Sequence, residues 1–114
     1  MSKRDPRVRL LHMRDYAQKA VSMAESHTRD DLDEDEKLMF ALTHLVELVG
    51  EAASQVPAET RAENQAIPWP SVIGIRNKLI HEYEDIDYDI LWDTVNEGLP
   101  ELIHELNKII GEDD

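Results

Sequence analysis

The sequence predicts an all-α fold, an antiparallel up-and-down helical bundle of four main helices in one domain spanning residues 1–114. Four stretches carry apolar residues at helical spacing, and none shows the period-two alternation of a strand. Prolines and acidic runs separate these stretches. A chain of 114 residues is long enough for one hydrophobic core, and burial against a partner would still help it.

The first helix is expected from about residue 6 to residue 26, with Pro6 in its first turn, where a missing backbone N–H costs least. Its apolar positions follow helical spacing, and they are Val8, Leu11, Tyr16, Ala20 and Met23. The run from Asp30 to Asp33 is expected to end it.

The second helix is expected to begin in the acidic run at residues 33–36, because carboxylates favour the positive end of a helix dipole. Leucine and valine recur at steps of four, three and four, at Leu38, Leu42, Leu45 and Val49. The helix is expected to end near Val56-Pro57. Residues 57–68 then predict a loop with room for a short helical turn.

The third helix follows two prolines that flank Trp69, and it is expected from Pro70 or Ser71 to about His81 or Tyr83. The fourth is expected from about Asp87 to Ile110, with its apolar residues on one side. Pro100 lies inside it and predicts a kink, because its ring removes a backbone donor and crowds the carbonyl four residues earlier.

Composition excludes several classes of site. The chain has no cysteine, so it has no disulfide framework, thiolate metal site or cysteine nucleophile. The basic N-terminus is not followed by the apolar segment of a secretory signal, and no apolar stretch reaches the ~20 residues that span a bilayer. We therefore expect a cytoplasmic protein without a membrane partner.

The formal net charge of −13 is unevenly distributed. Residues 1–19 contain six basic and two acidic residues, whereas residues 84–114 contain eleven acidic residues and only Lys108. Nucleic-acid binding usually relies on basic surface, so the overall negative charge argues against it. The uneven distribution weakens that objection, because the N-terminal segment is basic. The acidic segment suits either a basic partner or a surface adapted to a salty cytoplasm.

The residues most suggestive of a site lie in the segment from Arg76 to Tyr83, which combines a fixed cation, an amide, an imidazole and a phenol. If the segment is helical, Leu79 and Ile75 fall on one apolar stripe and Ile80 falls on a second one, bordered by the polar residues. Two stripes on one short helix imply two buried contacts. We infer that one faces the bundle and the other meets the same helix of a second copy across a two-fold axis.

Arg76-Asn77 followed by His81-x-Tyr83 resembles the signature of the HEPN superfamily. The chain looks like the minimal HEPN toxins, the HepT-like ribonucleases that pair with MNT nucleotidyltransferase antitoxins. Further blocks fit in the right order over essentially the whole chain, at residues 50–52, 67–70, 86–88 and 99–102. The resemblance implies an all-helical homodimer in which the Arg and His motifs of two copies face each other in a cleft.

The resemblance also implies metal-independent endoribonuclease activity without a cofactor, and the residue types suit that chemistry. His81 is expected to act as base or acid, and Arg76 to stabilise charge on the phosphate. Asn77 is expected to orient the substrate or the imidazole. In the resembling toxins the tyrosine at the position of Tyr83 receives AMP from the MNT partner, and Glu51 is a candidate to hold the arginine or histidine.

Other interpretations stay open at this stage. Arg76 could form a plain inter-helix salt bridge, His81 could be a residue favoured at a helix C-terminus, and Glu51 could be solvated. A non-catalytic HEPN module that binds a nucleotidyltransferase or a nucleotide is the alternative function, and a salt-adapted bundle without a site is a third. Glu101-x-x-His104 is a single step of the pattern that di-iron bundles need twice, so no metal site is expected.

Overall fold

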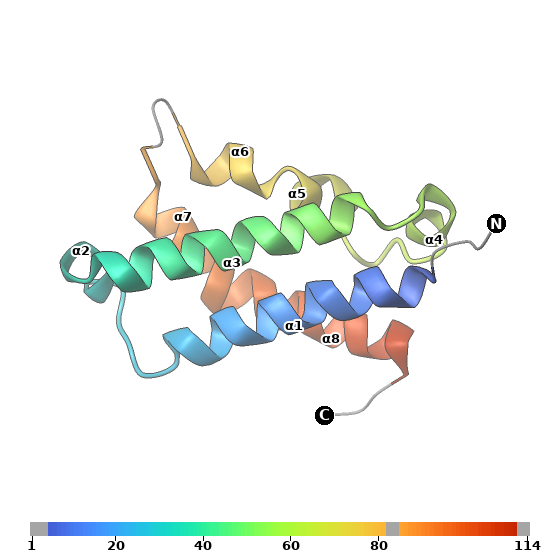
Figure 1. Cartoon of the computed structure of the whole chain (residues 1–114), viewed down its shortest axis with the longest axis horizontal. Helices are drawn as coiled ribbons and strands as arrows, with labels where there is room; N and C mark the ends of the chain where they lie inside the picture. The colour runs from blue at the N-terminus through green and yellow to red at the C-terminus, as the bar shows by residue number, and fades with distance from the viewer. Residues whose placement is uncertain (1–4, 82–84, 112–114) are drawn as a thin grey trace.

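The computed structural model describes residues 5–81 and 85–111, and every regular element within them is helical. The helices are α1 (Pro6–Ala24), α2 (Asp31–Glu34), α3 (Glu36–Ser54), α4 (Ala58–Ala62), α5 (Trp69–Ile73), α6 (Ile75–Leu79), α7 (Tyr88–Asp93), the π-helical segment η2 (Thr94–Gly98) and α8 (Leu99–Ile110). Figure 1 shows α3 at the centre, with α1 antiparallel to it on one side, α5 and α6 along the other, and α8 against α1. The predicted all-α bundle is confirmed.

Helix α1 begins where the sequence predicts. The Asp5 side chain accepts a hydrogen bond from the backbone N–H of Arg7 at 2.9 Å, and Pro6 occupies the first turn. The helix ends at Ala24, two residues before the expected end. Three of its five buried residues are alanines, and the five are Leu10, Met13, Ala17, Ala20 and Ala24. Small residues let helices pack closely, which suits the long contact of α1 with α3.

The acidic stretch after α1 forms a helical turn, α2, where the sequence predicts only a break. The turn forms because the Asp31 carboxylate accepts a hydrogen bond from the Thr28 backbone N–H at 2.9 Å and contacts His27 Nδ1 at 3.0 Å. Leu32 is buried in the core and fixes the turn to the bundle.

Helix α3 is the central element of the bundle. Asp35 caps it by accepting a hydrogen bond from the Leu38 N–H at 3.1 Å, as the acidic run predicts. Leu42, Val46 and Val49 are fully or almost fully buried along its length. The short turn expected within residues 57–68 is also present, as α4.

The third predicted helix is wrong in two respects. It is divided at Gly74 into α5 and α6, and it ends at Leu79 rather than at His81 or Tyr83. Ile80 adopts an extended conformation and pairs with Ile86 in an antiparallel bridge. The hairpin pairs backbone groups that a longer helix would have used itself, and so it ends the helix.

The fourth predicted helix has the expected limits but a different irregularity. Asp87 caps α7 at its start, and Gly111, with a φ of 87°, ends α8 in a left-handed conformation. Between them the chain forms the π turn η2, in which the Leu99 N–H donates to the Thr94 carbonyl. This turn lies directly before Pro100, whose ring cannot complete the regular hydrogen-bond pattern. The disturbance predicted as a kink is therefore a π turn.

The core is continuous from α1 through α3 to α8, and Leu79 of α6 lies fully buried in it. Leu79 thus fixes the short helix that carries Arg76 and Asn77 against the rest of the bundle. None of the described helices is long and apolar enough to cross a membrane.

Candidate functional site

Helix α6 presents Arg76 and Asn77 on the outside of the bundle, next to α3. Gly50 of α3 makes this approach possible, because a Cβ built there would lie 3.0 Å from the Val72 carbonyl oxygen and 3.1 Å from a methyl carbon of Ile75. The block 50–52 of the sequence therefore has a packing role: its glycine sets the distance between α3 and the segment α5–α6.

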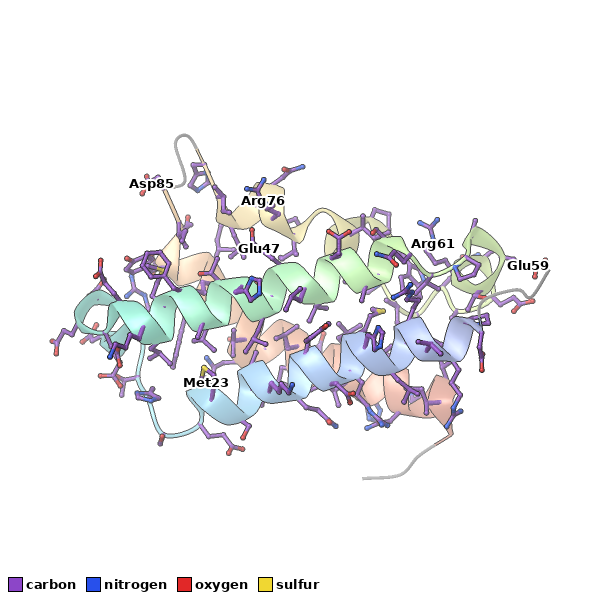
Figure 2. All side chains as sticks on the ribbon, viewed as in Figure 1. Met23, Glu47, Glu59, Arg61, Arg76 and Asp85 are labelled. Carbon is purple, nitrogen blue, oxygen red and sulfur yellow. The ribbon has the colours of Figure 1, made fainter. Side chains whose placement is uncertain are left out.

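Arg76 lies on the exposed side of α6, and its side chain is 65% exposed. Its Nε donates to Glu47 Oε2 of α3 at 2.9 Å, and Figure 2 shows the two residues facing each other. Nε is one of five donors on a guanidinium, so the two terminal amino groups are the donors that a phosphate would meet. The contact orients the cation and leaves it at the surface.

His81 lies beyond the end of α6, in the hairpin that follows it. Its backbone N–H donates to the Asp85 carbonyl at 2.9 Å, and the Asp87 N–H donates to the Leu79 carbonyl at 2.7 Å. The imidazole is 53% exposed, and its Nε2 lies 3.4 Å from Asp87 Oδ2. His81 is therefore not part of the helix, contrary to what the sequence had suggested, although it remains near the end of α6.

The Asp87 carboxyl next to His81 has a shifted pKa. Its pKa is lowered, first because its carboxylate accepts a hydrogen bond from the Ile90 backbone N–H, and second because it faces His81. Burial acts in the opposite direction but is the weaker effect. The carboxylate is therefore ionised at neutral pH and places a fixed negative charge beside the imidazole.

Asn77 follows Arg76 on α6 and is exposed. Its backbone N–H donates to the Gly74 carbonyl at 3.0 Å, which places it in the first turn of the short helix. Lys78, the next residue of α6, is exposed as well. Tyr83, the expected position of modification and substrate contact, lies outside the described residues.

Glu51 is the carboxylate that the sequence suggests as a partner of Arg76 or His81. It is exposed on α3, and the carboxylate that contacts Arg76 belongs to Glu47, one helical turn earlier. Residues four apart share a helix face, so the periodicity of α3 makes Glu47 as good a candidate as Glu51. The sequence did not point to Asp87 either, although an aspartate three residues before a helical Ile90 is a typical N-cap.

A mainly apolar groove of about 750 Å³ runs between α3, the α5–α6 segment and the start of α8. It is lined by Val46 and Val49 of α3, Val72 and Ile75 of the α5–α6 segment, and Leu102 of α8, with Lys78 among its polar lining residues. The groove lies beside α6, so this helix borders a second apolar surface in addition to the core.

Within residues 5–81 and 85–111, no group of three or more histidine, aspartate or glutamate side chains is arranged to hold a metal ion. Arg76 and His81 supply what phosphoryl chemistry requires from a protein: a cation that stays charged and a group that transfers protons near neutral pH. Each is held by a carboxylate from another element or from across the hairpin.

Comparison with known proteins agrees with this chemistry. The family described as "Ribonuclease HepT-like" matches residues 13–109. A Thermococcus cleftensis protein named "Probable ribonuclease HepT" is 33% identical over 86% of this chain and 92% of its own length. A protein of Caldanaerobacter subterraneus subsp. tengcongensis, named as a "Putative RNase", is 31% identical over 92% of this chain and 94% of its own. No solved structure matches significantly.

Proposed function

This chain belongs to the HepT-like ribonuclease family, and from that premise we propose that it is an endoribonuclease, the toxin of a HEPN/MNT toxin–antitoxin pair. One observation carries the proposal. Arg76 and His81 are both largely exposed, yet each is oriented by a carboxylate. Exposed residues held in this way are arranged for a ligand, because surface ion pairs add little to stability.

The proposed reaction requires no metal ion. His81 removes the proton from a ribose 2′-OH or delivers a proton to the departing 5′-oxygen, which is general base or general acid catalysis. Arg76 donates to the phosphate oxygens as negative charge develops on them. Asn77, exposed beside Arg76, hydrogen-bonds the substrate and holds it in position.

The active form is proposed to be a homodimer in which two copies of α6 face each other and share one site. Leu79 is fully buried in the core, whereas Ile73, Ile75 and Ile80 are only partly buried. Partly buried isoleucines beside an exposed arginine suit an interface with an apolar centre and a functional rim. Two Arg76 and two His81 side chains would then meet in one cleft.

The MNT-type nucleotidyltransferase is the proposed antitoxin partner, and Tyr83 is the proposed position at which it attaches AMP. A phosphate group beside the cleft would compete with RNA for Arg76 and repel the substrate backbone. This step is supported by family membership and by the sequence pattern of residues 81–83.

The test is cleavage of RNA by purified protein, freed of its partner, in buffer that contains EDTA. The parent is expected to cut, and His81→Ala and Arg76→Ala are expected to lose about 10²-fold or more of the rate while staying folded. His44→Ala, on the exposed side of α3, is the matched control and should cut like the parent. A folded His81→Ala variant that cuts at the parental rate would remove the catalytic role of His81.

The alternative is a non-catalytic module that binds a nucleotidyltransferase or a nucleotide. The acidic surface of the C-terminal half favours it, because exposed carboxylates recur along it at Asp85, Asp89, Asp93, Glu97 and Glu101. Such a surface attracts a basic protein and repels RNA. This alternative predicts no cleavage by the parent, together with a complex that dissociates as salt is raised.

A further inference from the structure

Asp87 uses its two carboxylate oxygens for two different tasks. Oδ1 accepts a hydrogen bond from the Ile90 backbone N–H at 3.0 Å and so caps α7. Oδ2 faces His81 Nε2 at 3.4 Å. Because the cap fixes the orientation of the carboxylate, the second oxygen is held toward the imidazole before any substrate binds.

The backbone holds the same pair together. His81 and Asp87 lie on the two arms of the hairpin, which is closed by the bridge between Ile80 and Ile86 and by the hydrogen bond from His81 to Asp85. These backbone contacts therefore hold the aspartate and the histidine next to each other.

A third contact anchors the start of α7 to the loop between α1 and α2. Arg29 donates to Asp89 Oδ1 at 2.6 Å and to Asp33 at 3.1 Å, and its guanidinium lies 5.7 Å from the centre of the Tyr88 ring. Asp87 follows Ile86, which pairs with Ile80, and directly precedes Tyr88, the first residue of α7, so its backbone is held on both sides.

We propose that Asp87 is the positioning residue of His81: it fixes the imidazole with Nε2 protonated and directs Nδ1 to exchange the proton with RNA. A carboxylate only accepts hydrogen bonds, so the ring nitrogen that faces it carries the hydrogen. In neutral His81 the other nitrogen, Nδ1, is then the base. Once Nδ1 has taken a proton, the negative charge of Asp87 stabilises the imidazolium. The inference rests on the proposed ribonuclease function for its catalytic meaning, but its geometry can be tested without RNA.

The Asp87→Asn variant separates the two tasks. Asparagine caps helices about as well as aspartate, so its amide oxygen is expected to accept from Ile90 and preserve α7. Its NH₂ group then faces His81, and a donor in that position favours the tautomer in which Nε2 accepts and Nδ1 carries the hydrogen. The substitution thus exchanges the favoured tautomer of His81 and keeps both the side chain and the helix cap.

The primary experiment is nitrogen-15 NMR of the imidazole groups at a pH of about 8.5, where an ordinary histidine with a pKa of roughly 6.5 is neutral. The His81 signals are assigned from their loss in His81→Ala. The parent is expected to show mainly the Nε2–H tautomer, and Asp87→Asn a shift toward Nδ1–H. Identical tautomer populations in the two proteins would overturn the inference.

Asp35→Asn is the matched control, because Asp35 caps α3 through the same kind of hydrogen bond and has no contact with His81 among those the structure describes. It should change neither the tautomer nor the rate. With an RNA oligonucleotide, Asp87→Asn is expected to lower kcat about 10- to 100-fold and to change KM less than about twofold. The expected loss in kcat is smaller than the full contribution of general acid–base catalysis, because His81 itself is still present.

The two proposals fail in different ways. If the tautomer shifts but the parent does not cut RNA, the positioning of His81 by Asp87 stands and the ribonuclease function fails. If the parent cuts RNA and Asp87→Asn cuts equally well with an unchanged tautomer, the function stands and the role of Asp87 fails.

Discussion

At the scale of single residues, the site consists of two exposed pairs. Arg76 and Glu47 form the salt bridge between α6 and α3 that a purely structural role of Arg76 would require. The arginine side chain is nevertheless 65% exposed. A pair this accessible contributes no more than about 0.2–1 kcal/mol to stability. The contact is therefore too weak to explain the arginine by folding alone, and orientation of the cation is its better explanation.

The first prediction compares the two candidate carboxylates on α3. Glu47→Gln is expected to lower the rate of RNA cleavage several-fold, because the Arg76 guanidinium loses the charged acceptor at 2.9 Å that orients it. The free energy of unfolding should change by less than about 1 kcal/mol. Glu51→Gln, one turn away on the same helix, is the comparison. A larger loss for Glu51→Gln would restore the role that the sequence suggested for Glu51.

The second prediction concerns stability at acid pH. The pKa values of Asp31 and Asp87 are lowered from 3.8, in both cases mainly by a backbone hydrogen bond and then by a histidine. A lowered pKa in the folded state means that the unfolded chain binds the proton first, so this stabilisation is present above pH 3.8 and is lost as pH falls further.

Urea unfolding at pH 6 and pH 3 measures the effect. Asp31→Asn and Asp87→Asn keep a hydrogen-bond acceptor without a titrating group, so each should lose less stability between the two pH values than the parent does. Equal losses in the parent and both variants would show that these two carboxylates do not govern acid stability.

At the scale of elements, the close approach of α3 to the segment α5–α6 places the motif. Gly50 sits at this contact, and the nearest atom to a Cβ there is a backbone oxygen, which cannot move as a flexible side chain can. Helix α6 has only five residues, so its position depends on this packing and on Leu79 rather than on its own helix propensity.

The third prediction follows from that contact. Gly50→Ala is expected to destabilise the protein by about 1–3 kcal/mol and to reduce RNA cleavage, because the added methyl group pushes α5 and α6 away from α3. Gly98→Ala is the matched control. The nearest atom to its Cβ is 4.0 Å away, and alanine should stabilise this exposed helical position by up to about 1 kcal/mol. Urea unfolding midpoints measure both, and equal shifts would contradict the packing argument.

At the scale of the whole molecule, charge and assembly decide how RNA could bind. A net charge of −13 repels a polyanion at long range, so binding must depend on a local concentration of cations. Pairing two copies of α6 would double the local count of Arg76 and Lys78 side chains. The proposed dimer would therefore give an acidic protein a cationic cleft.

The fourth prediction is that dimerisation and activity are lost together. Ile73→Asp introduces a charge at the partly buried apolar end of α5, beside α6, and should shift the protein from dimer to monomer and abolish cleavage. Val8→Asp is the control, since Val8 is 43% exposed on α1, far along the chain from the motif. Sedimentation velocity measures the state of assembly. A monomeric parent that cuts RNA would refute the shared site.

The sequence by itself determined the helical class, the limits of the two long helices, and the segment that we propose as the site. Helical periodicity and caps such as Asp5 and Asp35 act within a few residues, so they can be recognised without tertiary contacts. The family follows equally from sequence, because the order and spacing of motif residues are properties of the chain.

Only the tertiary structure decided where the motif helix ends and which carboxylates hold the motif. The segment after Leu79 has helical propensity, but the bridge between Ile80 and Ile86 takes its backbone groups into a hairpin and carries His81 to Asp87. Likewise, the choice of Glu47 over Glu51 depends on how α3 is rotated against α6. Both outcomes depend on contacts between distant parts of the chain, and local propensity contains no information about such contacts.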